Sequence, residues 1–274
     1  MSVTDRSPRT LRAVLFDKDG TLVDLRATWV PRYRAAARVL ARAAGRDDGF
    51  ALELLRRLGW DPAAGRLAAD SPLLWATNAM IAERWAAEPE LAHLGRGGID
   101  PAALALAELD DEERHPPQPL GDVAGLLSRL AARGLALGLA TMDSEAAARR
   151  TAEKLGIAPR LAFLAGCDSG HGLKPAPGMV RAFCRAVGVE PEAVALVGDS
   201  PADLAMARAA GCGLVVAVRS GGGPPETLAA LADHLLESVH ELDDLLDRLA
   251  PPRPHPARSC SRSRGKSSAK LQGR

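Results

Sequence analysis

Two aspartates lie two positions apart in the segment VLFDKDGTLVD, residues 14–24, directly after an apolar run. Residues two apart in an extended backbone point to the same side, so Asp17 and Asp19 can face one ligand. Lys18 would then point away from that ligand, and we give it no catalytic role. The pair marks a candidate site at the end of a buried strand.

Further chemical groups follow other apolar runs. Thr141 follows the run 135–140, Asp199 and Asp203 lie in VGDSPADLA, and Lys174 lies in GHGLKPAPG just before a predicted helix. Any one of them could simply cap a helix or line a turn. Since ligands of open α/β sheets bind beyond the carboxyl ends of the strands, we expect all of these groups at one edge. Clustered carboxylates repel each other unless a cation lies among them, and hard oxygen ligands suit Mg²⁺.

The elements that would position these groups are short apolar strands alternating with helices. We predict strands over 12–17, 135–140, 194–199 and 213–218, with a further candidate in LADHLL, and helices in SEAAARRTAEKLG, PGMVRAFCRAVG and PADLAMARAAG. This alternation predicts an α/β fold with a doubly wound parallel sheet.

The interval between the first two predicted strands is too long for one crossover. Residues 28 to about 118 contain several helical patterns and no convincing strand, and they end in the proline-rich linker HPPQP. We therefore predict an all-helical insertion, whose four tryptophans would anchor a core of its own. The expected division is a core of residues 1–27 and 119–250, a helical cap of residues 28–118, and a tail of residues 251–274.

Composition favours a globular protein of a reducing compartment. The chain has 274 residues, 47% of them apolar, and only 3% are aromatic, which weakens a single-strand nucleic-acid interpretation. The tail carries seven Lys or Arg and no acid, and we expect it to be disordered, with only a weak hint of nucleic-acid binding. The cysteines show no metal-like spacing, and no apolar leader or membrane span is evident, so we expect a cytoplasmic protein. The oligomeric state stays open.

The order of the motifs resembles the haloacid dehalogenase (HAD) superfamily. FDKDGTLVD, the strand end at Thr141, Lys174 before Pro175, and GDSPADLAMARAAG look like its four motifs. The likeness covers residues 10–24 and 120–240, and the insertion is similar to the cap of the subgroup that includes phosphoglycolate phosphatase. The resemblance implies a Rossmann-like core beneath a helical cap.

The resemblance also implies roles for the site residues. Asp17 would be the nucleophile that becomes an aspartyl-phosphate, and Asp19 the acid and base that protonates the leaving oxygen and then activates water. Thr141 and Lys174 would hold the phosphoryl oxygens. These roles agree with what a carboxylate nucleophile and a separate acid can contribute to phosphoryl transfer.

The implied cofactor is Mg²⁺, held by Asp17, the backbone carbonyl of Asp19, and Asp199, with Asp203 supporting the site. The implied activity is a phosphatase acting on a small phosphorylated metabolite, with 2-phosphoglycolate as the first choice, and no membrane partner is expected. Two alternatives stay open: a phosphomutase of the same superfamily, and a catalytically silent protein that binds a phosphorylated ligand or signals.

Overall fold

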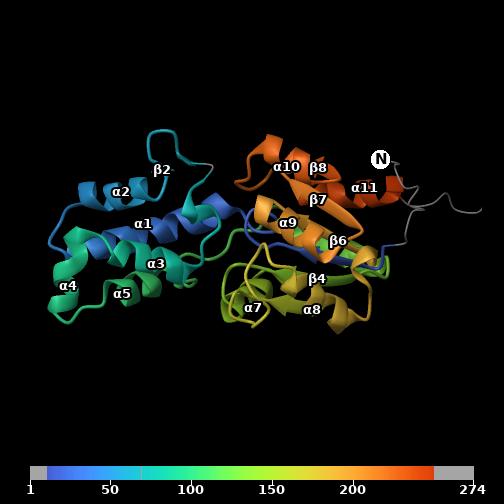
Figure 1. Cartoon of the computed structure of the whole chain (residues 1–274), viewed down its shortest axis with the longest axis horizontal. Coiled ribbons are helices and arrows are strands. Elements are labelled where there is room, and N and C mark those ends of the chain that lie inside the picture. The colour runs from blue at the N-terminus through green and yellow to red at the C-terminus, as the bar shows by residue number, and fades with distance from the viewer. Residues whose placement is uncertain (1–10, 69, 250–274) are drawn as a thin grey trace, which may run out of the picture.

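A six-stranded parallel sheet organises the larger part of the molecule. The structure is a computed structural model that describes residues 11–68 and 70–249 (Figure 1), and the predicted tail lies outside the described residues. The strand order is β5-β4-β1-β6-β7-β8, and every neighbouring pair is parallel. The strands are β1 (Ala13–Phe16), β4 (Ala136–Ala140), β5 (Leu161–Ala165), β6 (Val194–Gly198), β7 (Leu214–Val218) and β8 (His234–Leu236).

Alternate residues of the strands feed two separate hydrophobic layers. Val14 and Phe16 of β1 belong to one cluster, while Ala13 and Leu15 belong to the other, as the period of two in a strand requires. One layer is covered by α6 (Val123–Ala132), α7 (Glu145–Lys154) and α11 (Leu242–Leu249), and the other by α8 (Gly178–Val187), α9 (Pro201–Ala210) and α10 (Pro225–Leu231). Helices on both faces confirm the predicted doubly wound sheet.

The insertion between β1 and β4 has a core of its own, at the left in Figure 1. Its helices are α1 (Leu25–Ala43), α2 (Asp48–Arg57), α3 (Asn78–Ala86), α4 (Ala92–Arg96) and α5 (Pro101–Leu109). Trp29, Trp60 and Trp85 are buried in this core, but Trp75 is 41% exposed. We refer to α1–α5 and their connections as the cap. Short 3₁₀ turns complete the described chain: η1 (Pro72–Leu74), η2 (Pro89–Leu91), η3 (Ala158–Arg160), η4 (Pro191–Ala193) and η5 (Val239–Glu241).

The expectation that the cap contains no strand is wrong at one place. Two two-residue strands, β2 (Trp60–Asp61) and β3 (Arg66–Leu67), form an antiparallel hairpin. Asp61 folds the turn because its Oδ1 accepts hydrogen bonds from the backbone N–H groups of Ala63 and Ala64, the side-chain chemistry typical of Asx turns.

The two chain segments that connect core and cap lie side by side. Val23 and Pro119 form an antiparallel bridge, and the N–H of Asp24 donates to the carbonyl of Gln118 at 2.8 Å. Arg32 of α1 reaches back to the second segment, where its Nη2 donates to the carbonyl of His115 at 2.7 Å. The cap is thus attached through one paired double connection, next to the end of β1. No helix in the described ranges has the length and apolar character that crossing a membrane would need.

Candidate active site

Three buried carboxylates meet beyond the carboxyl ends of β1 and β6. Asp17 follows β1, Asp199 follows β6, and Asp203 lies in the first turn of α9. One carboxylate oxygen of each lies within 4.8 Å of those of the other two. The Asp203 carboxylate is fixed by a capping box, since its Oδ2 accepts from both the N–H and the hydroxyl of Ser200. The strand ends therefore bring together acids that are far apart in the sequence, as expected.

Lys174 lies inside this acidic cluster. Its Nζ is 2.5 Å from Asp17 Oδ1 and 2.6 Å from Asp203 Oδ1, and the side chain is buried. Burial alone would favour the neutral amine, but the carboxylates of Asp17 and Asp203 outweigh it and raise the Lys174 pKa. Lys174 is therefore held as a cation in direct contact with two of the three buried acids.

The single positive charge of Lys174 does not balance the three carboxylates of Asp17, Asp199 and Asp203. Burial raises the Asp17 pKa to about 7, opposed by Lys174 and reinforced by Asp203. Burial together with Asp17 raises the Asp199 pKa well above its ordinary value. Asp17 Oδ2 is buried and accepts no hydrogen bond from the described residues. An unpartnered oxygen among hard carboxylate ligands fits a divalent cation such as Mg²⁺.

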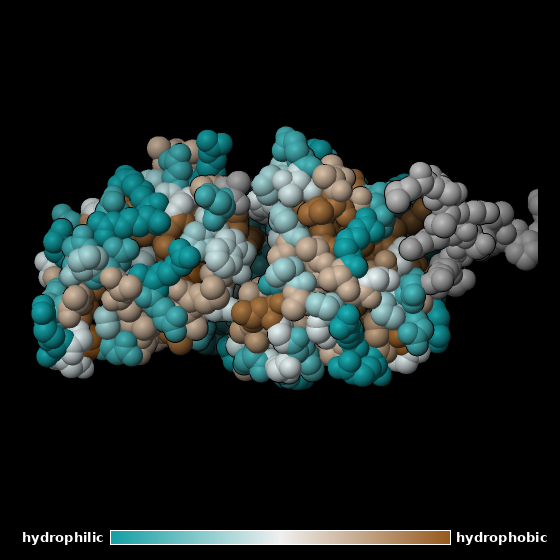
Figure 2. All heavy atoms as spheres, viewed as in Figure 1, coloured by the Kyte–Doolittle hydropathy of each residue, from teal (hydrophilic) through white to brown (hydrophobic). Residues whose placement is uncertain are grey.

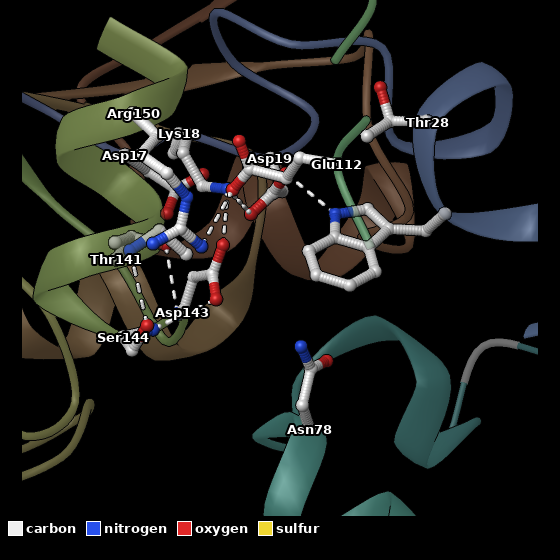
Figure 3. A network of polar contacts seen from close by, with 12 residues as sticks. Asp17, Lys18, Asp19, Thr28, Asn78, Glu112, Thr141, Asp143, Ser144 and Arg150 are labelled. Carbon is white, nitrogen blue, oxygen red and sulfur yellow. Dashed lines mark hydrogen bonds and ion pairs between the residues drawn. The ribbon is translucent and has the colours of Figure 1, made fainter. Parts of the chain in front are cut away.

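Asp19 lies beside this cluster and is held through both of its oxygens (Figure 3). Trp29 Nε1, from α1 of the cap, donates to Asp19 Oδ1 at 2.7 Å, and Lys18 Nζ lies 3.2 Å from Asp19 Oδ2. Lys18 therefore contacts Asp19, but it is not among the residues that line the cavity with Asp17 and Asp19, so nothing here contradicts the prediction that it points away from the ligand. The strand ends at Phe16 and residue 18 is in a bend, from which the Lys18 side chain reaches Asp19 and Asp143.

Asp143 completes the arrangement, and the sequence interpretation missed it. Its Oδ2 accepts from Lys18 Nζ at 2.8 Å, and its own N–H donates to Thr141 Oγ1 at 3.1 Å. Thr141 itself is buried directly after β4. Its place two residues after Thr141, in the same strand-end segment TMDS, is the sequence signal that could have indicated Asp143, whereas its pairing with Lys18 is visible only in the structure.

All six predicted residues line one cavity of about 340 Å³ between core and cap. The core supplies the acids, Thr141 and Lys174, while α1, η1 and α3 supply the opposite wall. In Figure 2 the surface is indented where the two parts of the molecule meet. The cavity is of the size that holds a small metabolite.

A model of haloacid dehalogenase-like hydrolases matches residues 11–211. Phosphoglycolate phosphatase of Rhodospirillum rubrum is 32% identical over 250 residues, which cover 89% of this chain and 92% of the relative. N-acetylmuramic acid 6-phosphate phosphatase of Pseudomonas aeruginosa is 28% identical over 87% of this chain and 96% of its own. The structure of a putative phosphatase from Clostridium difficile superposes with a TM-score of 0.64 at 19% identity, covering 87% of this chain and 99% of that one.

These matches assign the family. Fold and site together define a capped α/β hydrolase with an acidic centre at the strand ends. The chain belongs to the haloacid dehalogenase-like hydrolases. Within them it is similar to phosphatases, with phosphoglycolate phosphatases among its relatives at modest identity, and its buried acidic cluster is suited to a metal.

Proposed function

We propose that this chain is a magnesium-dependent phosphatase that hydrolyses a small phosphorylated metabolite through an aspartyl-phosphate on Asp17. The observation that carries the proposal is the position of Asp17. Asp17 is buried and lines the same cavity as Asp19. Its carboxylate is paired with Lys174 and lies next to the carboxylates of Asp199 and Asp203.

The reaction would proceed in two displacements at phosphorus. An oxygen of Asp17 forms a bond to phosphorus while the bond to the organic oxygen breaks, and Asp19 gives that oxygen its proton. Water then attacks the phosphorus of the aspartyl-phosphate, Asp19 takes the proton from the water, and Asp17 is released with inorganic phosphate. Splitting the reaction in this way is the advantage of a carboxylate nucleophile.

The remaining site residues would bind and orient the phosphoryl group. Lys174 and the Thr141 hydroxyl would hold its oxygens, since Lys174 is a buried cation and both side chains face the cavity. Asp17, Asp199 and the backbone carbonyl of Asp19 would hold Mg²⁺, with Asp203 in support through its contact with Lys174. Bound Mg²⁺ supplies neutralisation of the charge on the transferring phosphoryl group.

The first substrate to assay is 2-phosphoglycolate, because several relatives carry the name phosphoglycolate phosphatase. Ranking a panel of phosphorylated metabolites by kcat/KM would show how 2-phosphoglycolate compares with other substrates.

The test compares the wild type with Asp17→Asn in Mg²⁺, in chelator, and in Ca²⁺. We expect the wild type to lose activity on chelation and to recover it with Mg²⁺, whereas the looser shell of Ca²⁺ should inhibit. Asp17→Asn should abolish turnover. Asp244→Asn, which changes an exposed acid of α11, should behave as wild type. Activity that survives exhaustive chelation, or turnover by Asp17→Asn, would refute the proposal.

A further inference from the structure

The wall that the cap contributes to the cavity carries no ionisable acid or base other than the phenol of Tyr33. Among the described residues, its lining includes no Lys, Arg, His, Asp or Glu. Leucines, an alanine, Met80 and two tryptophans make up most of it, and Tyr33 and Asn78 are the other polar side chains. Any charge on the organic part of a substrate would therefore face an uncharged surface.

Most polar groups of this wall are already satisfied within the protein. Trp29 Nε1 donates to Asp19, and the Tyr33 hydroxyl donates to the carbonyl of Leu73 at 2.9 Å. Asn78 Nδ2 donates to Asp110 Oδ1 at 2.7 Å, which fixes the orientation of the amide. The amide oxygen of Asn78 accepts no hydrogen bond from the described residues, and Figure 3 shows this side chain directed from α3 toward the side of Trp29 and Asp143. The Asn78 amide oxygen is thus free to accept a hydrogen bond from a hydroxyl group of a ligand.

Two exposed apolar side chains meet at the same cavity from opposite sides. Trp75 of the cap is 41% exposed and Leu173 of the core is 42% exposed. Four large apolar side chains in the described ranges are exposed, and these two line the cavity. Their exposed surface is what an apolar part of a ligand would cover.

The core side of the cavity is strongly acidic. Five aspartates line it, and the one lysine among the lining residues is already paired with two of them. A cation that occupies the acidic cluster would be engaged by the aspartates and the phosphoryl group. A carboxylate on the organic part of the substrate would therefore be buried without a partner, which is unfavourable.

We infer that the preferred substrates are phosphate monoesters whose organic group is uncharged, with an apolar face for Trp75 and Leu173 and a hydroxyl for Asn78. Phosphorylated carboxylates, 2-phosphoglycolate among them, would rank below them. This inference rests on the proposed phosphatase function and specifies its substrate class.

A matched pair of substrates tests the inference on the wild-type protein. 2-Phosphoglycolate and 2-hydroxyethyl phosphate are nearly equal in size and differ in carrying a carboxylate or a hydroxymethyl group. We expect kcat/KM to be higher for the hydroxyethyl ester by on the order of tenfold or more, because only its hydroxyl has a partner. A smaller preference, or a preference for 2-phosphoglycolate, would overturn the inference. If neither these esters nor any other is hydrolysed in an Asp17-dependent manner, the proposed function itself fails.

A substitution in the wall gives the converse test. Met80→Lys places a cation in the apolar wall, and Met80→Gln is the neutral control. Only Met80→Lys should raise the ratio of kcat/KM for 2-phosphoglycolate to that for hydroxyethyl phosphate, by roughly tenfold. If the two variants unfold at the same temperature as wild type and give equal ratios of these kcat/KM values, the inferred substrate class is contradicted. If a variant does not fold, the comparison of the two substrates on the wild type is the deciding test.

Discussion

Asp17 is buried among other carboxylates, and Lys174 only partly compensates for its charge. The native protein therefore holds a proton on Asp17 up to a pKa of about 7, where an unfolded aspartate has already released it. Where the native state binds more protons than the unfolded state, stability falls as pH rises. Without metal, Asp17 should thus reduce stability progressively between about pH 4 and pH 7.

Asp17→Asn tests this contribution, because asparagine carries no charge at either end of the pH range and also removes the repulsion that helps to raise the Asp199 pKa. In chelator, the free energy of unfolding of the variant should rise relative to wild type by roughly 2–3 kcal/mol from about pH 5 to about pH 7.5. Urea denaturation of both proteins at the two pH values measures the difference. A gap that does not change with pH would show that Asp17 ionises normally in the native protein.

Lys18 is the second buried lysine of the described residues, besides Lys174, and its removal should strongly destabilise the protein. Its Nζ contacts Asp143, whose side chain is 3% exposed, and Asp19. Lys18→Met should lower the free energy of unfolding by about 3–5 kcal/mol, because it leaves a buried carboxylate unpaired. Arg149→Met, which removes an exposed ion pair with Glu145, should cost less than about 1 kcal/mol. Similar losses in the two variants, measured by urea denaturation, would contradict this account.

The sequence predicted six of the residues that line the site, but it missed Asp143 and did not predict how the charged side chains pair. Asp17, Thr141 and Asp199 each follow a strand, and that placement alone brings them to one edge. The Lys18–Asp143 pair joins residues 125 positions apart, through a bend that no period of the sequence describes. It could not be found without the path of the backbone.

Helix α1 links the cap to the chemistry of the core. It begins directly after the first connecting segment, and within its second turn Trp29 donates to Asp19. Arg32 stacks on the Trp29 ring at 4.8 Å and binds the second connecting segment. The position of α1 therefore bears on the orientation of the residue proposed as acid and base.

Trp29→Phe removes the indole N–H while keeping an aromatic ring. We expect kcat/KM for an alkyl phosphate to fall roughly tenfold, since protonation of a poor leaving group depends on Asp19. The value for 4-nitrophenyl phosphate, whose leaving group needs little protonation, should change much less. Trp60→Phe is the control, because Trp60 is buried in the cap and its N–H has no partner among the described residues. Equal effects on both esters would show that Trp29 serves packing alone.

Strands with a continuous apolar run were predictable, and the short edge strand β8 (His234–Leu236) also falls within the candidate LADHLL. Strands β1, β4, β6 and β7 are continuous buried runs and agree with the predicted ranges to within one or two residues. Strand β5 was missed although its five residues, LAFLA, are all apolar; it lies at the edge of the sheet, and only Ala165 of the strand is fully buried. The β2–β3 hairpin was missed because its strands have only two residues each.

The whole molecule divides the work between a core with the acids and a cap with the facing wall. We propose that residues 28–118 choose the substrate. Exchanging this segment for that of a relative with another substrate should transfer the order of kcat/KM values to the chimera, while dependence on Mg²⁺ and on Asp17 remains. If the preference stays with the core, substrate selection lies in core residues near the cavity, such as Leu173.

The stereochemical course at phosphorus tests the central claim most directly. A phosphorothioate ester made chiral with oxygen isotopes is hydrolysed by the wild type in isotopically labelled water, and the configuration of the released thiophosphate is determined. Attack by Asp17 followed by attack of water gives two in-line displacements, so we predict retention of configuration. Inversion would mean that water attacks the substrate directly, and it would contradict a covalent intermediate on Asp17.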